Sequence, residues 1–355
     1  MSSAAYVGSR LRMMPGDESV EAFARKDPAR FGEALTMFCG KAEVEVADVA
    51  GNASQRSLSE KIDKALLARL LRSPQFSKAD IARMKALAEP HASAWLNALP
   101  NVLPFDNRLT AVEFRVVLQH RLGVPLVATA LQGECPACRQ TAIDRPGGRP
   151  AGSRPRLLDG NGHHALTCLR SSTGDAVIRH NAIQTRFTRM CRTAGFTCLT
   201  EQGGIKRRPA DLLVRGYFSD GTSAALDFVT IVRSSPLSAD PHSFKAGTSA
   251  TEEGEKQKHK ENDGPCEENG WRCIPMAVNT FGGWGKEAVL FIQDLAVAYS
   301  TATDVSLWDA TNFIYITLEV PLMRHNARAI VLTRHGPPAG AGGEAMRASS
   351  LDGRV

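Results

Sequence analysis

The stretch that decides the fold is KRRPADLLVRGYFSDGTSAALDFVTIV, residues 206–232. It holds two runs rich in aliphatic and β-branched residues, 210–218 and 224–232, separated by a Ser-Asp-Gly turn signal. This pattern predicts a β-hairpin. Segments 196–202 and 272–280 have the same character, so we expect four strands in the second half of the chain.

Helical patterns dominate the first part of the chain. Apolar residues recur at three- and four-residue spacing between residues 57 and 88. A further helix is expected after Thr110, because Glu113 completes a capping box with it and Gly123 supplies a stop signal. We therefore interpret residues 1–125 as a helical region.

Further helices alternate with the strands. An amphipathic helix is expected over residues 174–195, and a strongly charged one over 251–262. Two more are predicted over 286–303 and 309–334, and Pro321 should kink or break the second of these. Runs of helix and strand in this order predict the α+β class.

The charge of the chain is concentrated in its centre. The 355 residues carry a formal net charge of +6, whereas residues 126–215 hold 14 Lys and Arg against 6 Asp and Glu, a local net of +8. A basic centre of this kind suggests a polyanionic partner, or else a solvated basic loop. No stretch is apolar enough for a membrane span or a secretory signal, so we expect an intracellular protein without a membrane partner.

Three cysteines and a histidine pair have the spacing of a zinc site. Cys135-x2-Cys138 is followed, after a loop rich in Pro, Gly and Arg, by His163-His164-x3-Cys168. Tetrahedral Zn²⁺ takes four nitrogen or sulfur ligands, and two such turns would supply two each. The spacing leaves both His163 and His164 open as the ligand. Unrelated cysteines or a redox-active pair are the alternatives.

Two carboxylates lie on the strands of the predicted hairpin. Asp211 opens the first strand, and Asp227 lies within the second, 16 residues later. Carboxylates on adjacent strands can share a hard cation such as Mg²⁺, which activates water and stabilises charge on a phosphate. The alternative is a pair of ordinary carboxylates near strand ends.

Basic side chains surround these carboxylates in the sequence. Lys206, Arg207 and Arg208 directly precede the first strand, where they would bind phosphates beside a cleavage site or form a surface turn. Arg179 and His180 begin the helix before it and would face the same groove or plain solvent.

The order of the motifs resembles one family. A CCHC knuckle, a helix beginning RHN, then RPAD, LDF, a lysine-rich helix and GWRCIPMAVNTFGGWG occur in this order. They resemble the C-terminal region of non-LTR retrotransposon polyproteins that carry a restriction-like endonuclease. The helical segments QRSLSEKIDKALLARLL and LTAVEFRVVLQHRLGVPL resemble the linker before the knuckle, so the resemblance covers residues 55–334.

The resemblance implies a zinc knuckle and, after it, a PD-(D/E)xK-like nuclease domain. The implied zinc ligands are Cys135, Cys138, His163 and Cys168, with His163 preferred over His164 for its HxxxxC spacing. The expected domains are the helical linker region 1–125, the knuckle 126–172 and the nuclease 173–334, with its mixed sheet flanked by helices. The tail 335–355 is rich in Gly, Pro, Ala and Ser and is expected to be disordered.

The resemblance also implies catalytic residues. Asp211 and Asp227 would bind magnesium or manganese, with Glu201 as a further carboxylate. The catalytic lysine of the family is displaced from the strand to the next helix, where Lys258 is the best match and Lys256 the second.

The chain departs from the family pattern at several positions. Glu261 stands where a second lysine is expected, with Lys260 adjacent, and Asn279 stands where a glutamate is expected. RPAD inserts a residue into the plain PD motif. The chain has no Asp-Asp dipeptide, so the paired-aspartate motif of a reverse transcriptase is absent.

The sequence therefore favours a metal-dependent, nuclear DNA endonuclease derived from a retroelement, with RNA as a second possible partner. The alternative is a catalytically impaired nucleic-acid-binding remnant that keeps a structural zinc ion. Neither the target sequence nor the oligomeric state follows from these patterns.

Overall fold

The structure is a computed structural model. It describes residues 55–98, 108–126, 159–168, 175–200, 210–232 and 250–335, together with positions 29, 33, 36, 39, 40 and 135. The chain divides into two compact units, Met1–Ser77 and Lys78–Val355. The first unit contains helix α5 (Gln55–Arg72), which lies within the predicted helical region.

A four-stranded mixed sheet forms the centre of the second unit. Its strands are β1 (Cys198–Thr200), β2 (Leu212–Val214), β3 (Ser223–Ile231) and β4 (Trp271–Asn279), in the order β1-β2-β3-β4. The first two pairings are antiparallel, and β3 pairs with β4 in parallel. Helix α11 (Ala250–Glu268) lies between β3 and β4 in the sequence and so provides the long crossover that a parallel pair requires.

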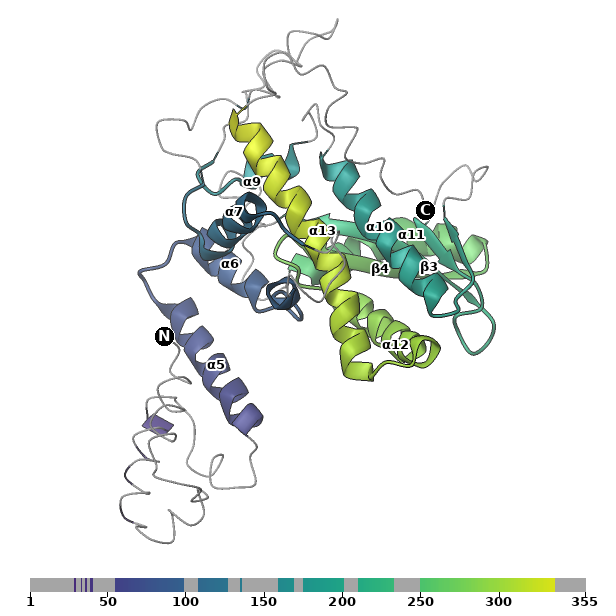
Figure 1. Cartoon of the computed structure of the whole chain (residues 1–355), viewed down its shortest axis with the longest axis horizontal. Coiled ribbons are helices and arrows are strands. Elements are labelled where there is room, and N and C mark those ends of the chain that lie inside the picture. The colour runs from purple at the N-terminus through teal and green to yellow at the C-terminus, as the bar shows by residue number, and fades with distance from the viewer. Residues whose placement is uncertain are drawn as a thin grey trace, which may run out of the picture. The chain divides into compact units, whose positions relative to one another are not determined.

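The remaining helices of this unit surround the sheet or pack beside it (Figure 1). They are α6 (Lys78–Leu87), the short 3₁₀ helix η1 (Ala94–Asn97), α7 (Ala111–Leu122), α9 (His163–Thr167), α10 (Asp175–Thr193), α12 (Lys286–Thr303) and α13 (Leu307–His335). The predicted α+β class is confirmed.

Alternate residues of the strands point to two different layers. Leu212 and Leu226 face the main core, where they join Phe187 of α10 and Phe291 of α12. Their sequence neighbours face the opposite side, where Leu213 and Ala225 pack with Cys266 of α11. The two-residue period of the strands thus separates a layer of α10, α12 and α13 from a layer that contains α11.

The helix signals read from the sequence hold for α7 and fail for α13. Thr110 and Glu113 form the capping box of α7, and Gly123 ends it at φ 70°. Pro321 was expected to kink or break the last helix, and the break is wrong, because α13 runs through this position without interruption. The side chains around Pro321 are fully buried, among them Leu318 and Leu322, and this packing outweighs the loss of one backbone hydrogen bond.

The segment from α6 to α7 belongs to the same unit as the sheet. Trp95 and Val117 are buried in the main core, and Arg328 of α13 donates to Glu113 at 3.0 Å. Residues from all three expected domains therefore contribute to the main core of this unit.

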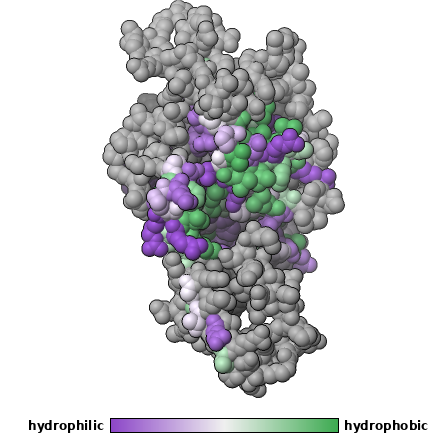
Figure 2. Space-filling model, turned by 90° about the vertical axis from the view of Figure 1, so that its left-hand side faces the viewer, coloured by the Kyte–Doolittle hydropathy of each residue, from purple (hydrophilic) through white to green (hydrophobic). Residues whose placement is uncertain are grey.

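Apolar side chains also gather on part of the surface (Figure 2). Exposed apolar residues of this unit include Val112, Leu122 and Trp308, the last of them 74% exposed. A gathered apolar patch marks a surface that another segment or a partner can cover. Within the described residues, no helix is long and apolar enough to cross a membrane.

Candidate functional site

The register of β2 and β3 places the two predicted carboxylates side by side. Leu212 lies opposite Leu226 in this antiparallel pair, so the next step along the ladder brings Asp211 opposite Asp227. The Asp211 N–H donates to the Leu226 carbonyl at 2.9 Å, which continues the ladder by one bond. Two residues that lie 16 positions apart in the sequence thereby become direct neighbours.

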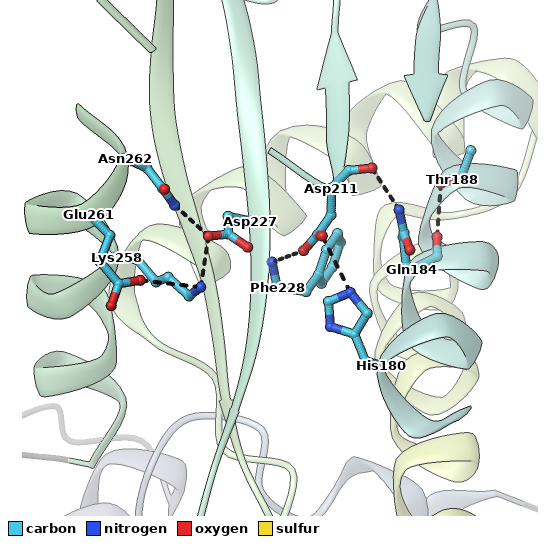
Figure 3. Close-up of polar contacts among 9 residues, drawn as sticks. All are labelled: His180, Gln184, Thr188, Asp211, Asp227, Phe228, Lys258, Glu261 and Asn262. Atoms are coloured by element: carbon cyan, nitrogen blue, oxygen red, sulfur yellow. Dashed lines mark hydrogen bonds and ion pairs between the residues drawn. The ribbon is translucent and has the colours of Figure 1, made fainter. Parts of the chain in front are cut away.

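Asp211 is held from two sides (Figure 3). Its carboxylate accepts the Phe228 N–H at 2.8 Å and lies 3.4 Å from Nε2 of His180 on α10. Its carbonyl oxygen accepts from the Gln184 side chain at 2.6 Å, one turn further along the same helix. Both α10 and β3 therefore fix the position of this carboxylate.

Asp227 is held from α11. Lys258 Nζ lies 2.9 Å from its carboxylate, and the side-chain amide of Asn262 donates to the same oxygen. Lys258 also lies 3.6 Å from Glu261. Lys258 and Asn262 are four positions apart, so they form one stripe of α11 that faces the carboxylate (Figure 3).

The carboxyl groups of Asp211 and Asp227 belong to paired positions of neighbouring strands, and their pKa values move in opposite directions. Burial raises the pKa of Asp227 to about 6; Lys258 opposes this rise, and the neighbouring charge of Asp211 adds to it. Burial also acts to raise the pKa of Asp211, but the hydrogen bonds from His180 and the Phe228 N–H outweigh it and lower this pKa. Burial and the different hydrogen-bond partners produce this split, the neighbouring negative charge adds to it, and a divalent cation would relieve the repulsion between the carboxylates.

The basic groups at the site are charged more readily than usual. The hydrogen bond to Asp211 raises the pKa of His180, against the effect of burial. Burial acts to lower the pKa of Lys258, but its bond to Asp227 outweighs burial and leaves the pKa raised. The site thus combines two carboxylates with two cations, one from α10 and one from α11.

Other predicted basic residues lie elsewhere. The Lys256 side chain is 64% exposed and pairs with Glu252 at 2.8 Å, and Lys260 is exposed. Arg179 was expected to bind nucleic acid, and the structure corrects this expectation, because Arg179 is only 4% exposed. Its guanidinium donates to Asn326 of α13 at 2.9 Å, so it joins two helices in the core.

Five of the predicted site residues lie outside the described residues. They are Cys138, Glu201, Lys206, Arg207 and Arg208.

A second group of predicted ligands also converges. Cys135, His164 and Cys168 are buried, and one ligand atom of each lies within 4.8 Å of the others. The two sulfurs are 3.8 Å apart. Zn–S bonds of about 2.3 Å at a tetrahedral angle separate two sulfurs by about 3.8 Å, so this pair already has the spacing of a zinc site.

Asp159 organises the approach to this group. Its carboxylate accepts the backbone N–H groups of His163 at 3.0 Å and His164 at 2.7 Å, at the start of α9. The His163 ring packs edge-on against His120 with centroids 5.5 Å apart, and His163 is not part of the three-residue group. The geometry thus favours His164 as the ligand, whereas the HxxxxC spacing favoured His163.

The departure at Asn279 lies away from the carboxylates. Asn279 pairs with Ile231, whereas Asp227 pairs with Pro275, four positions or about 13 Å back along the ladder. Its side chain accepts the Phe281 N–H at 2.7 Å and so shapes the turn after β4. The asparagine therefore removes no group from the Asp211–Asp227 site.

Sequence reasoning missed three residues at these sites: Asn262, Gln184 and Asp159. Asn262 could have been found from the sequence, because it lies four positions after Lys258 and therefore on the same face of the helix. The other two bond to backbone groups, Gln184 to the Asp211 carbonyl and Asp159 to the N–H groups of α9, and neither belonged to a recognisable motif.

No protein-family model and no curated protein matches the chain.

Proposed function

We propose that the chain is a metal-dependent endonuclease that hydrolyses a phosphodiester of DNA, on a fold of the restriction-endonuclease-like type. The convergence of Asp211, Asp227 and Lys258 carries the proposal. The resemblance of the motif order to the retrotransposon endonucleases supports it, as does the mixed sheet with α11 between β3 and β4.

The residues of the site fit a divalent cation. Asp211 and Asp227 offer oxygen ligands from paired positions of neighbouring strands, and Mg²⁺ or Mn²⁺ prefers oxygen. When bound, such an ion lowers the pKa of a water and neutralises charge on the scissile phosphate. The ion would also remove the repulsion that raises the pKa of Asp227.

Lys258 and His180 have distinct roles in this proposal. Lys258 is charged and only 21% exposed, so its ammonium stabilises the extra negative charge of the phosphate as the water oxygen bonds to phosphorus. The bond from phosphorus to the leaving sugar oxygen then breaks, and this oxygen takes up a proton in place of the one that the water gives up. His180 holds Asp211 in place from α10. Asn262 holds Asp227 in the same way from α11.

A structural zinc ion forms the second part of the proposal. Cys135, His164 and Cys168 would supply three ligands, with Cys138 as the expected fourth. Such a site would fasten α9 and the chain before it, where few apolar side chains are available for a core.

Nicking of supercoiled plasmid DNA with Mg²⁺ tests the catalytic assignment. We expect wild type to nick DNA, and Asp227→Ala and Lys258→Ala to lose about 100-fold or more in rate, equivalent to about 3 kcal/mol. Lys256→Ala is the matched control, since it removes an exposed lysine of the same helix that pairs with Glu252. Full activity in Asp227→Ala would overturn the proposal.

A catalytically impaired nucleic-acid-binding protein is the second candidate. It is favoured by Glu261, which stands 3.6 Å from Lys258 where the family pattern has a lysine. This candidate predicts salt-dependent DNA binding with no nicking in Mg²⁺ or Mn²⁺. Recovery of nicking in Glu261→Lys would assign the impairment to this one position.

A further inference from the structure

A further group of metal-ligating side chains, distinct from Cys135, His164 and Cys168, lies between α11 and β4. One ligand atom each of His259, Asp263 and Cys273 lies within 4.8 Å of the other two. Cys266 and Cys273 pack in the same small cluster on the α11 side of the sheet. Three side chains with one nitrogen, one oxygen and one sulfur ligand therefore meet at this point, and Cys266 lies beside Cys273 as the candidate fourth ligand.

The secondary structure brings these four residues together. His259, Asp263 and Cys266 are spaced by four and three positions, so they form one stripe along α11. Cys273 pairs with Ala225 in the sheet, and both side chains face the α11 layer. The short turn between α11 and β4 keeps Cys266 and Cys273 in contact.

The surroundings of His259 suit a metal ligand. Its Nδ1 lies 2.8 Å from Asp263, and its Nε2 lies 2.7 Å from Glu287 at the start of α12. Histidines that bind metals usually donate their second ring N–H to a carboxylate, which fixes the tautomer and the ring orientation. Glu287 is placed for this role, because its own N–H donates to Glu255 at 2.9 Å.

We infer that His259, Asp263, Cys266 and Cys273 form a zinc site of their own, separate from the Cys135–His164–Cys168 group. Two thiolates, one imidazole and one carboxylate are a ligand set that zinc accepts. Tetrahedral bonds to zinc place neighbouring ligand atoms about 3.3–3.8 Å apart, so closure of His259, Asp263 and Cys273 from within 4.8 Å requires shifts of about 1.5 Å at most, and the Cys266 thiol would turn toward them as the fourth ligand.

Zinc content of the purified full chain tests the inference. We expect wild type to hold one more equivalent of zinc than His259→Ala or Cys273→Ser, measured by elemental mass spectrometry after dialysis. Cys198→Ser is the matched control, because Cys191 and Cys198 are also a pair of buried cysteines but are not part of any three-residue metal-binding group in the described residues. Equal zinc content in wild type, His259→Ala and Cys273→Ser would overturn the inference.

A second measurement uses wild type alone and so does not depend on the folding of a variant. We expect zinc to protect Cys266 and Cys273 from alkylation, and a chelator to remove this protection, while the core thiol of Cys191 stays unreactive. Protection that is unchanged by the chelator would count against the site. A Cys266–Cys273 disulfide in the purified protein, found by peptide mapping, would also overturn it.

Discussion

Replacement of Asp227 by asparagine should stabilise the metal-free protein. The carboxyl group is 13% exposed, and its pKa rises from 3.8 to about 6 on folding. Each pKa unit is worth about 1.4 kcal/mol, so ionisation of Asp227 costs the folded state about 3 kcal/mol at most. An asparagine side chain would carry no charge and could still contact the same neighbours, so Asp227→Asn should gain about 1–3 kcal/mol at pH 8.

The sign of the pH dependence follows from the direction of the shift. Because the pKa is raised on folding, the stability that this group contributes is complete below about pH 4 and is lost as the pH rises through about 6. The advantage of Asp227→Asn over wild type should therefore be full at pH 8 and smaller at pH 5. Added Mg²⁺ should stabilise wild type and leave the variant almost unchanged.

Urea unfolding in magnesium-free buffer, followed by circular dichroism at pH 5 and pH 8, measures the gain in stability and its pH dependence. The same titration with added Mg²⁺ measures the effect of the ion. Asp220→Asn is the control, because Asp220 is exposed and its pKa is lowered, mainly by the Thr222 N–H, so this variant should gain nothing. The reasoning would be refuted if Asp227→Asn were no more stable than wild type at pH 8, or if its advantage were equal at pH 5 and pH 8.

Three further predictions concern the cap of α7, the zinc group that contains His164, and the magnesium site at Asp227. Thr110→Ala should lower the free energy of unfolding by about 1 kcal/mol in urea titrations, since it removes the capping box; an unchanged value would contradict the role of the cap. His164→Ala should lose one equivalent of zinc whereas His163→Ala keeps it, and the reverse result in elemental analysis would restore the choice made from spacing. Magnesium affinity, measured by calorimetry, should fall about tenfold per pH unit below about pH 6 as Asp227 takes up a proton, and a constant affinity would exclude Asp227 as a ligand.

Local patterns predicted the strands well because alternation and turn chemistry are properties of neighbouring residues. β3 and β4 match the expected segments to within one residue at each end. β2 stops earlier than predicted, since the chain turns at Gly216 with φ 59° before the aromatic residues that suggested a longer strand.

The failures of prediction arise where distant residues decide the outcome. Arg179 looked like a surface cation, but its partner Asn326 lies 147 positions away. Pro321 looked like a helix breaker, but the core around it keeps α13 continuous. His163 and His164 are adjacent on α9, where successive side chains point about 100° apart, and spacing in the sequence does not show which one faces the thiols.

The candidate site shows why its lysine can be supplied either by the strand β3 or by the helix α11. Asp227 and Val229 point to the same side of β3, toward α11, so a lysine at position 229 would reach the carboxylate from the strand. Lys258 reaches the same carboxylate at 2.9 Å from α11. The chemistry requires an ammonium group on this side of the sheet, and either element can supply it.

The same helix also connects the two proposed sites. Lys258 and Asn262 form the stripe of α11 that faces Asp227, while His259, Asp263 and Cys266 form the adjacent stripe that faces β4. Successive residues of a helix differ by about 100° in direction, so a rotation of α11 moves both stripes together. A zinc ion would fix this rotation if it were bound by His259, Asp263, Cys266 and Cys273. The Lys258 ammonium would then keep its position when a divalent cation replaces it as the partner of the Asp227 carboxylate.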